Sequence, residues 1–219
     1  MNLSPIVQVK GGYEYEGVFY KSKEEIYFVW HLTELKTANL IKSFKTPEPL
    51  QLLFPVSIDI VVEKNGKRKL KAKHLLNDVT YRADFEIVWR REAEGRFFDT
   101  ITSEPKSVWK DCPFRANRHI FLPSAEENPV SLIDVKGGFK GIHNNSAITF
   151  PIISKLLWNT TGWYVNKIIP KELFEKSFTP MRYFYTDSGD SVRKRTWKFK
   201  VLEDIQPYQK DFMEFPELI

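Results

Sequence analysis

An acidic and a basic residue, Asp134 and Lys136, stand two positions apart in the segment VSLIDVK, residues 130–136. Alternate side chains of a β-strand point to the same face, about 7 Å apart along the backbone, so this spacing places a carboxylate and an ammonium in one pocket. A second carboxylate, Asp84, lies in VTYRADFEIVWR, residues 79–90, which alternates like a strand. If the two strands pair, we expect Asp84 to lie beside Asp134, and two such carboxylates raise each other's pKa unless a cation compensates them.

A hard divalent cation would compensate this carboxylate pair. Mg²⁺ binds one or two carboxylates together with waters and a substrate phosphate, and Mn²⁺ is the expected substitute. Such an ion polarises a phosphoryl oxygen and lowers the pKa of its bound water, while Lys136 would orient that water or offset charge in the transition state. The three residues therefore predict Mg²⁺-dependent hydrolysis of a phosphodiester.

Several other kinds of site are excluded by the sequence. One cysteine among 219 residues rules out an internal disulfide and a multi-thiolate zinc site, and the four histidines show no paired ligand spacing. Neither the G-x-S-x-G turn nor the P-loop string occurs. No run of about 18 apolar residues is present, and the first ten residues do not resemble a signal peptide. We therefore expect a cytoplasmic protein that does not span a membrane.

Basic residues exceed acidic ones by 33 to 28, and the excess is concentrated in two runs, 64–73 and 193–200. Such clustering favours a polyanionic partner, although a solvated face is the alternative. A basic hairpin beside a nuclease site would clamp a DNA backbone. The candidate DNA contacts are Lys64, Lys67, Arg68, Lys69, Lys71 and Lys73, with Lys155 as either a phosphate contact or a snorkelling surface lysine.

Hydrophobic periodicity predicts the elements that position these side chains. Ser22 and Glu25 have the spacing of a capping box, which starts a predicted helix over 23–38. The mostly apolar, β-branched segment 50–63 is predicted as a buried strand, and the Asn-Gly pair after it predicts a chain reversal. The polar, proline-containing segment 91–129 is predicted as an insertion. The remaining predictions are a strand or hairpin arm over 13–20, a strand over 130–136, a helix over 148–160, a strand over 163–169, and in the extension 171–219 a short helix and a strand over 196–202.

Two of these segments carry a family resemblance. YRADF (81–85) followed by IDVKG (133–137) resembles the D…(D/E)-x-K signature of the PD-(D/E)XK nuclease superfamily, most of all its small phage-encoded endonuclease-like proteins. The helix start at Tyr20, Ser22 and Glu25 and the later Phe150, Lys155 and Leu156 are similar to further motifs of that group. The resemblance covers about 13–170. It implies a restriction-endonuclease-like α/β core of order α-β-β-β-α-β, with a mixed sheet flanked by helices, in a single domain.

The same resemblance implies roles for four residues. Asp84 and Asp134 would be metal ligands, Lys136 the catalytic lysine and Glu25 an accessory acid, unless Glu25 serves mainly as the capping partner of Ser22. For Asp134 and Lys136 the alternative is a surface ion pair. The predicted function is a Mg²⁺-dependent DNA endonuclease of phage replication, recombination or genome processing, acting in the host cytoplasm. The alternatives are a Holliday-junction resolvase, expected as a homodimer, and a non-catalytic DNA-binding or virion protein with a nuclease fold.

Overall fold

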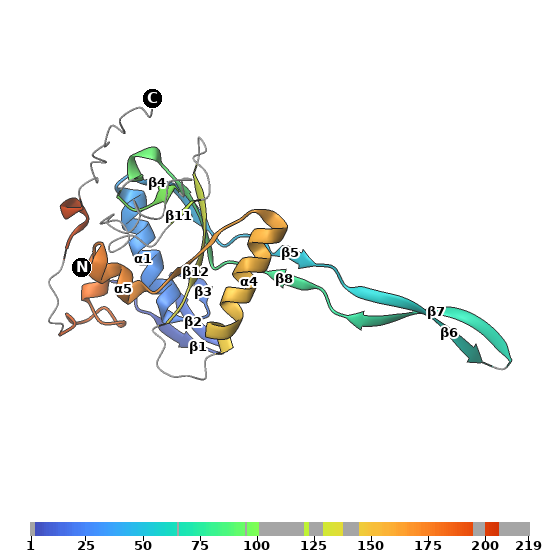
Figure 1. Cartoon of the computed structure of the whole chain (residues 1–219). Helices are drawn as coiled ribbons and strands as arrows, with labels where there is room; N and C mark the ends of the chain where they lie inside the picture. Colours follow the sequence, from blue (N-terminus) through green and yellow to red (C-terminus); the bar gives the residue numbers. More distant parts are fainter. Residues whose placement is uncertain are drawn as a thin grey trace, which may run out of the picture.

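The computed structural model describes residues 3–64, 66–94, 96–100, 121–122, 129–137, 145–194 and 200–205. Its centre is a four-stranded mixed sheet (Figure 1). The strand order is β13-β12-β9-β4, in which β4, β9 and β12 are antiparallel and β13 runs parallel to β12. The fold is therefore mixed α/β. The four strands are β4 (Ile41–Lys45), β9 (Phe85–Trp89), β12 (Val130–Val135) and β13 (Val165–Ile168).

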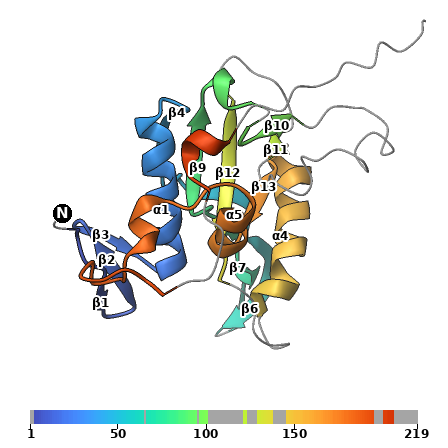
Figure 2. The same cartoon turned by 90° about the vertical axis from the view of Figure 1, so that its left-hand side faces the viewer.

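Two helices cover opposite sides of this sheet, α1 (Lys23–Thr37) and α4 (Asn145–Thr161) (Figure 2). The alternation of β12 explains this arrangement, because successive side chains of a strand point to opposite faces. Ile133 packs in the core that includes α1, whereas Leu132 packs in a second, smaller core with Leu157 of α4. A third, short helix, α5 (Pro170–Lys176), adds Leu173 and Phe174 to the core on the α1 side.

The predicted helix over 23–38 is confirmed as α1, and its start is the predicted capping box. The Ser22 hydroxyl accepts a 3.2 Å hydrogen bond from the Glu25 backbone N–H and donates a 2.9 Å bond to Glu25 Oε1. These bonds satisfy an otherwise unpaired donor of the first turn. One face of the helix is buried, and α1 contacts β12 of the central sheet. These contacts hold the first turn of α1 at the end of the sheet.

The segment 13–20 forms the predicted hairpin, extended by one more strand. The three-stranded antiparallel sheet contains β1 (Val7–Val9), β2 (Gly12–Tyr15) and β3 (Val18–Tyr20). Gly17 has a φ of 76° in the turn between β2 and β3, a left-handed conformation that glycine adopts without steric cost. This sheet leads directly into Ser22 and so places the aromatic side chains of β3 next to the start of α1.

The prediction of a buried strand over 50–63 is wrong. This segment forms two strands, β5 (Leu50–Leu53) and β6 (Val56–Lys64), and β6 is exposed along almost all of its length. β6 pairs with β7 (Lys67–Leu76), and β5 pairs with β8 (Val79–Tyr81), so a two-stranded arm projects from the body (Figure 1). Apolar, β-branched composition reports strand propensity, not burial. The predicted reversal is confirmed, since Lys64 pairs with Lys67 and Gly66 has a φ of 71°.

The strand that pairs with β9 on its other side is β4, in a segment for which the sequence predicted no strand. The predicted strand over 79–90 is likewise two strands, β8 and β9, because the chain leaves the arm and enters the central sheet at Arg82–Asp84. The predicted strands over 130–136 and 163–169 are confirmed as β12 and β13. The helix predicted over 148–160 begins three residues earlier, at Asn145, and ends at Thr161, immediately before Gly162, whose φ is 73°.

The remaining described elements are short. They are the 3₁₀ helices η1 (Arg91–Ala93), η2 (Met181–Phe184) and η3 (Leu202–Asp204), and the parallel pair β10 (Asp99–Thr100) and β11 (Phe121–Leu122). Most of the predicted insertion over 91–129, and residues 196–199 of the strand predicted over 196–202, lie outside the described residues; the rest of that segment, 200–202, is not a strand, since η3 begins at Leu202. None of the helices in the described part of the chain combines the length and the apolar character needed to cross a membrane.

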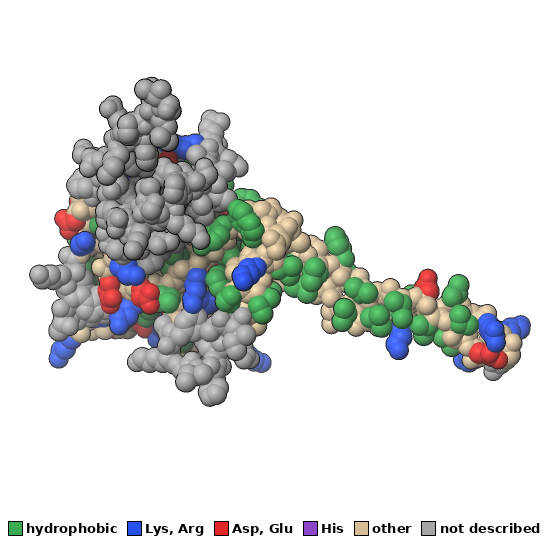
Figure 3. All heavy atoms as spheres, viewed as in Figure 1, with side chains coloured by type: hydrophobic (Ala, Val, Ile, Leu, Met, Phe, Trp, Pro, Cys, Tyr) green, Lys and Arg blue, Asp and Glu red, His purple; other side chains and the backbone are tan. Residues whose placement is uncertain are grey.

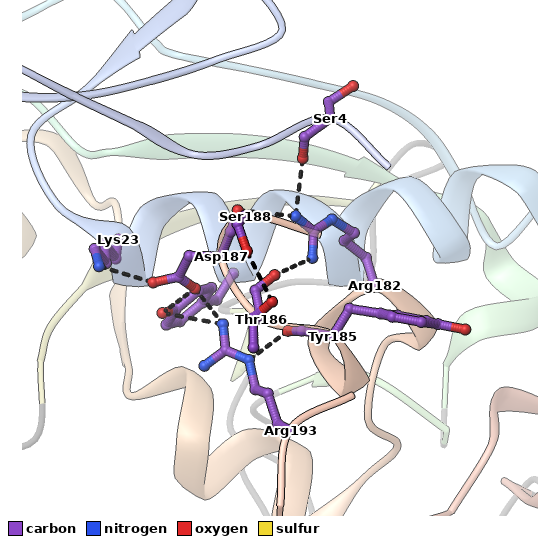
Figure 4. A network of polar contacts seen from close by, with 9 residues as sticks. Ser4, Lys23, Arg182, Tyr185, Thr186, Asp187, Ser188 and Arg193 are labelled. Carbon is purple, nitrogen blue, oxygen red and sulfur yellow. Dashed lines mark hydrogen bonds and ion pairs between the residues drawn. The ribbon is translucent and has the colours of Figure 1, made fainter. Parts of the chain in front are cut away.

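The C-terminal extension is attached to the start of α1 by a polar network around Asp187 (Figure 4). Lys23 Nζ donates a 2.7 Å hydrogen bond to Asp187 Oδ2, and the Tyr27 hydroxyl donates a 3.0 Å bond to Oδ1. Arg193 also forms an ion pair with Asp187. Burial raises the pKa of Asp187, but the Lys23 hydrogen bond and the charge of Arg193 outweigh it and hold that pKa below its usual range. The network fixes the extension beside the first turn of α1.

Candidate active site

Asp84 and Asp134 are brought together by the pairing of β9 with β12. The last paired positions are Phe85 and Ile133, so Asp84 and Asp134 stand opposite one another at the next position and on the same face. The backbone N–H of Asp84 donates a 2.9 Å hydrogen bond to the Ile133 carbonyl. The backbone N–H of Val135 donates a 2.7 Å bond to Asp84 Oδ2. The sequence-predicted juxtaposition of the two carboxylates is therefore present.

Electrostatic repulsion and burial act strongly on this pair. Burial, followed by the charge of Asp134, raises the pKa of Asp84 to about 7. The hydrogen bond from Val135 opposes that shift without cancelling it, and the more distant charge of Glu25 adds to it. Asp134 is itself only 6% exposed. A water-poor site that holds two carboxylates is one in which a cation would bind favourably.

Lys136 supplies the cationic group of the site. Its Nζ lies 2.5 Å from Asp134 Oδ1, and its backbone N–H donates a 2.8 Å hydrogen bond to the Ile168 carbonyl of β13. The ion pair of the alternative interpretation is present, but it is largely buried and not on the surface, since the side chain of Asp134 is 8% exposed and that of Lys136 is 23% exposed. A second lysine, Lys167 of β13, stands opposite Asp134 in the parallel register, so the two carboxylates lie among basic residues from two strands.

Glu25 lies at the start of α1, where it both caps the helix and lines a cavity. Its carboxylate accepts the Ser22 hydroxyl and a 3.2 Å hydrogen bond from the Lys21 backbone N–H, which confirms the capping interpretation. It also lines a cavity of about 360 Å³ together with Asp84. The capping and accessory-acid interpretations are therefore geometrically compatible. The neighbouring Glu24 approaches Gly137, the residue after Lys136, with its Oε1 3.5 Å from where a Cβ on Gly137 would lie.

This cavity contains basic and aromatic side chains that the sequence did not single out. Lys21, Lys45 and Arg82 line it, with Phe19 and Phe44 as aromatic walls. They come from the β3–α1 junction, from β4 and from the break between β8 and β9, and these segments meet only in the folded chain. Three cations beside the acidic side chains of Glu25 and Asp84 suit a polyanionic ligand in this cavity, which Asp134 and Lys136 do not line.

Tyr81 is a further residue that the sequence did not identify as functional. Its hydroxyl is buried and forms no hydrogen bond of normal geometry with the described residues. Burial and the nearby charges of Asp134 and Asp84 raise its pKa above the usual value, so the hydroxyl stays protonated. Its place in the YRADF motif, three residues before Asp84, was the available signal.

The candidate DNA-binding residues do not lie at the carboxylates. Lys64, Lys67, Arg68, Lys69, Lys71 and Lys73 all lie on the β6–β7 arm, which extends away from the central sheet (Figure 1). The interpretation of a clamp immediately beside the site is therefore corrected to a remote basic arm. Lys155 lies on the exposed side of α4, and no described contact joins it to the site.

The described residues contain no group of three or more histidine, cysteine, aspartate or glutamate side chains arranged to hold a metal. Mg²⁺ does not need such a group, since one or two carboxylates with waters and substrate phosphate suffice. The hard oxygen donors of Asp84 and Asp134, and the elevated pKa of Asp84, fit a hard divalent cation.

Neither the family models, nor the curated proteins, nor the solved structures include a match to this chain. The case for a function therefore rests on the residues of the site.

Proposed function

We propose that this protein is a Mg²⁺-dependent endonuclease that hydrolyses DNA phosphodiester bonds. The observation that carries the proposal is the Asp84–Asp134 pair at adjacent strand ends, in which Asp134 is buried, Asp84 is half-buried and Lys136 contacts Asp134. Two carboxylates placed against one another with little exposure to solvent repel each other, and this repulsion is costly unless a proton or a cation compensates it. A binding site for a divalent cation explains the arrangement.

Each residue has a distinct role in the proposal. Asp84 and Asp134 would hold the metal, with Mn²⁺ as a substitute, and the bound ion would supply Lewis-acid activation of the scissile phosphate and of a water. Lys136 donates hydrogen bonds from a fixed ammonium group, which can orient the attacking water and offset charge on the phosphoryl oxygens. Glu25 faces the cavity from α1 and would act as the accessory acid, through a water.

The arrangement of elements supports a restriction-endonuclease-like core. In chain order the central helices and strands are α1, β4, β9, β12, α4 and β13, which is the α-β-β-β-α-β order that the motif resemblance implies. The proposed metal ligands lie at the start of β9 and near the end of β12, where α1 contributes Glu25. The proposal includes a DNA partner, a phage origin and action in the host cytoplasm.

The direct test is cleavage of supercoiled plasmid and of branched DNA by the purified protein, in Mg²⁺ and in EDTA. We expect nicking that requires Mg²⁺, and we expect Asp134→Ala to abolish it while DNA binding persists. Asp190→Asn is the matched control, because Asp190 is an exposed aspartate remote in sequence from both strands, and this variant should cut normally.

Cleavage confined to branched DNA would instead support the Holliday-junction resolvase. Binding without cleavage on either substrate would support the non-catalytic alternative. Activity in EDTA, or normal cutting by Asp134→Ala, would contradict the proposed site.

A further inference from the structure

The β6–β7 arm separates its charges between two faces. In the antiparallel register, Lys69 pairs with Val62 and Lys71 with Ile60, whereas Arg68 pairs with Glu63. Directly paired side chains of a ribbon lie on the same face. We call the first face the lysine face; its described members are Ile58, Ile60, Val62, Lys64, Lys67, Lys69, Lys71 and Lys73. The opposite, mixed face contains Ser57, Asp59, Val61, Glu63, Arg68, Leu70, Ala72 and His74.

The lysine face therefore carries five positive charges and no acid among its described residues, whereas the mixed face carries one arginine and two acids. The 3.5 Å ion pair between Arg68 and Glu63 confirms that those two side chains share the mixed face. Along β7 the lysines recur every second residue, which is about 6.6 Å. The lysine face thus combines a row of cations on one strand with a row of aliphatic side chains on the other.

Most of the arm is exposed to solvent (Figure 3). Val62 is 36% exposed, Ile58 45%, Val61 63% and Leu70 74%. An isolated two-stranded ribbon in water is only marginally stable. Ile58 and Val62 belong to the lysine face, where a partner that binds the lysines would cover them, whereas Val61 and Leu70 lie on the mixed face.

Charge decides which partner fits. The arm residues 56–76 hold six basic and two acidic side chains, whereas the rest of the chain is close to neutral, with 27 basic and 26 acidic residues. A second copy would bring an equally basic arm or a nearly neutral body. A polyanion is the complementary partner for five lysines on one face.

We propose that the arm lies in the major groove of double-stranded DNA with its lysine face toward the DNA. The major groove of B-form DNA is about 12 Å wide and admits a two-stranded β-ribbon. The lysine row would contact phosphates of one strand, and Ile58, Ile60 and Val62 would contact base edges, including thymine methyl groups. The nine residues of β6 span about 30 Å, close to one turn of the duplex.

This inference extends the proposed function, because cleavage of the DNA that the arm binds depends on the proposed nuclease activity. It places duplex recognition on the arm and hydrolysis at the central sheet, so the substrate would need about one turn of B-form duplex beside the cleavage site. A-form RNA has a major groove that is too deep and narrow to be entered. Groove insertion therefore predicts a preference for duplex DNA over duplex RNA, whereas simple attraction of phosphates predicts none.

The test compares two neighbouring valines. Val61→Glu and Val62→Glu add the same charge at adjacent positions of the same strand, but on the mixed face and the lysine face, respectively. Binding is measured to a duplex DNA and to an RNA duplex of the same sequence, in EDTA so that no cleavage occurs. We expect Val62→Glu to weaken duplex DNA binding at least tenfold and Val61→Glu to change it less than twofold.

A second comparison removes charge. Replacing Lys69, Lys71 and Lys73 by glutamine should reduce the steepness of log affinity against log salt concentration by up to about 2.7, because each lost phosphate contact contributes about 0.9. In the matched control, three exposed lysines outside the arm, Lys10, Lys36 and Lys171, are replaced by glutamine, and this variant should leave the slope unchanged. A third variant joins Leu53 to Val79 by a two-residue Asn-Gly turn, which their direct pairing permits, and it should lose the preference for DNA over RNA.

Equal binding of DNA and RNA duplexes by the wild type, or equal effects of the two valine variants, would overturn the inference. If removal of the arm converted a dimer to a monomer without weakening DNA binding, the covering partner would be a second copy, which would also overturn it. Arm-dependent duplex binding in EDTA without any cleavage in Mg²⁺ would contradict the nuclease proposal alone, so the two failures are distinguishable.

Discussion

Asp84 and Asp134 face one another one position beyond the last paired residues of β9 and β12, and the backbone of Val135 holds the Asp84 carboxylate with a 2.7 Å hydrogen bond. The backbone therefore fixes one carboxylate against the other. Burial and the charge of Asp134 together raise the pKa of Asp84. In the metal-free protein this contact should destabilise the fold when both groups are ionised.

We expect Asp84→Asn to raise the free energy of unfolding of the metal-free protein, by on the order of 1 kcal/mol at pH 8. The folded pKa of Asp84 is about 7, well above its value of 3.8 in the unfolded chain. The folded state thus binds the proton more tightly, and stability falls as pH rises between these values. The advantage of the variant should therefore be small near pH 4 and grow toward pH 7.

Chemical denaturation of both proteins from pH 4 to pH 8 in EDTA measures this difference. Asp190→Asn, at an exposed aspartate, should show no comparable pH-dependent gain. A constant difference between wild type and Asp84→Asn across that range would mean that the two carboxylates do not interact.

Lys136→Ala should slow cleavage about 100-fold or more while leaving the affinity for DNA within twofold, because the ammonium is proposed to act in the transition state. Single-turnover cleavage with saturating protein separates the rate from binding. Lys36→Ala is a suitable control, since Lys36 is an exposed lysine in the last turn of α1, at the opposite end of that helix from Glu25. Full activity of Lys136→Ala would assign this lysine a purely structural role as the partner of Asp134.

The polar network at Asp187 should stabilise the attachment of the C-terminal extension to α1. We expect Asp187→Asn to reduce the free energy of unfolding by about 1 kcal/mol at neutral pH, since hydrogen bonds to charged groups contribute more than neutral ones and this group is partly exposed. Its pKa is depressed in the folded state, so this stability is present above the unfolded pKa and is lost as pH falls through the folded one. The free energies of unfolding of wild type and variant should therefore converge as the pH falls below about 4 in denaturation experiments. If the full difference persisted at pH 2, it would come from packing and not from the charge of Asp187.

The faces on which Asp84, Asp134 and Lys136 lie were predictable from sequence because they depend on local alternation, whereas the pairing of β9 with β12 that joins the two carboxylates had to be assumed. Asp134 and Lys136 share a face by simple alternation, and the acidic positions of the 79–90 segment lie opposite its apolar ones. The start of α1 was predictable for the same reason, since a capping box involves only four consecutive residues.

The lining of the cavity and the exposure of the arm could not be predicted from local sequence patterns, because both depend on contacts between segments that are distant in sequence. Lys21, Lys45 and Arg82 meet only because three separate segments converge at one end of the sheet. The strand β4 has only five residues and is followed by two prolines, so its pattern was too short to distinguish from a turn. The β-branched run of β6 predicted a strand correctly, but its exposure follows from pairing with the lysine-rich β7 alone.

The most direct test of the central claim, that Asp84 and Asp134 form a metal site, is a calorimetric titration of the DNA-free protein with Mn²⁺. We expect the wild type to bind Mn²⁺, and Asp134→Asn to lose that binding. We also expect wild-type affinity to fall as the pH is lowered below about 7, because the metal must displace the Asp84 proton. Identical titrations for wild type and Asp134→Asn, or no binding by the wild type at millimolar Mn²⁺, would contradict the account.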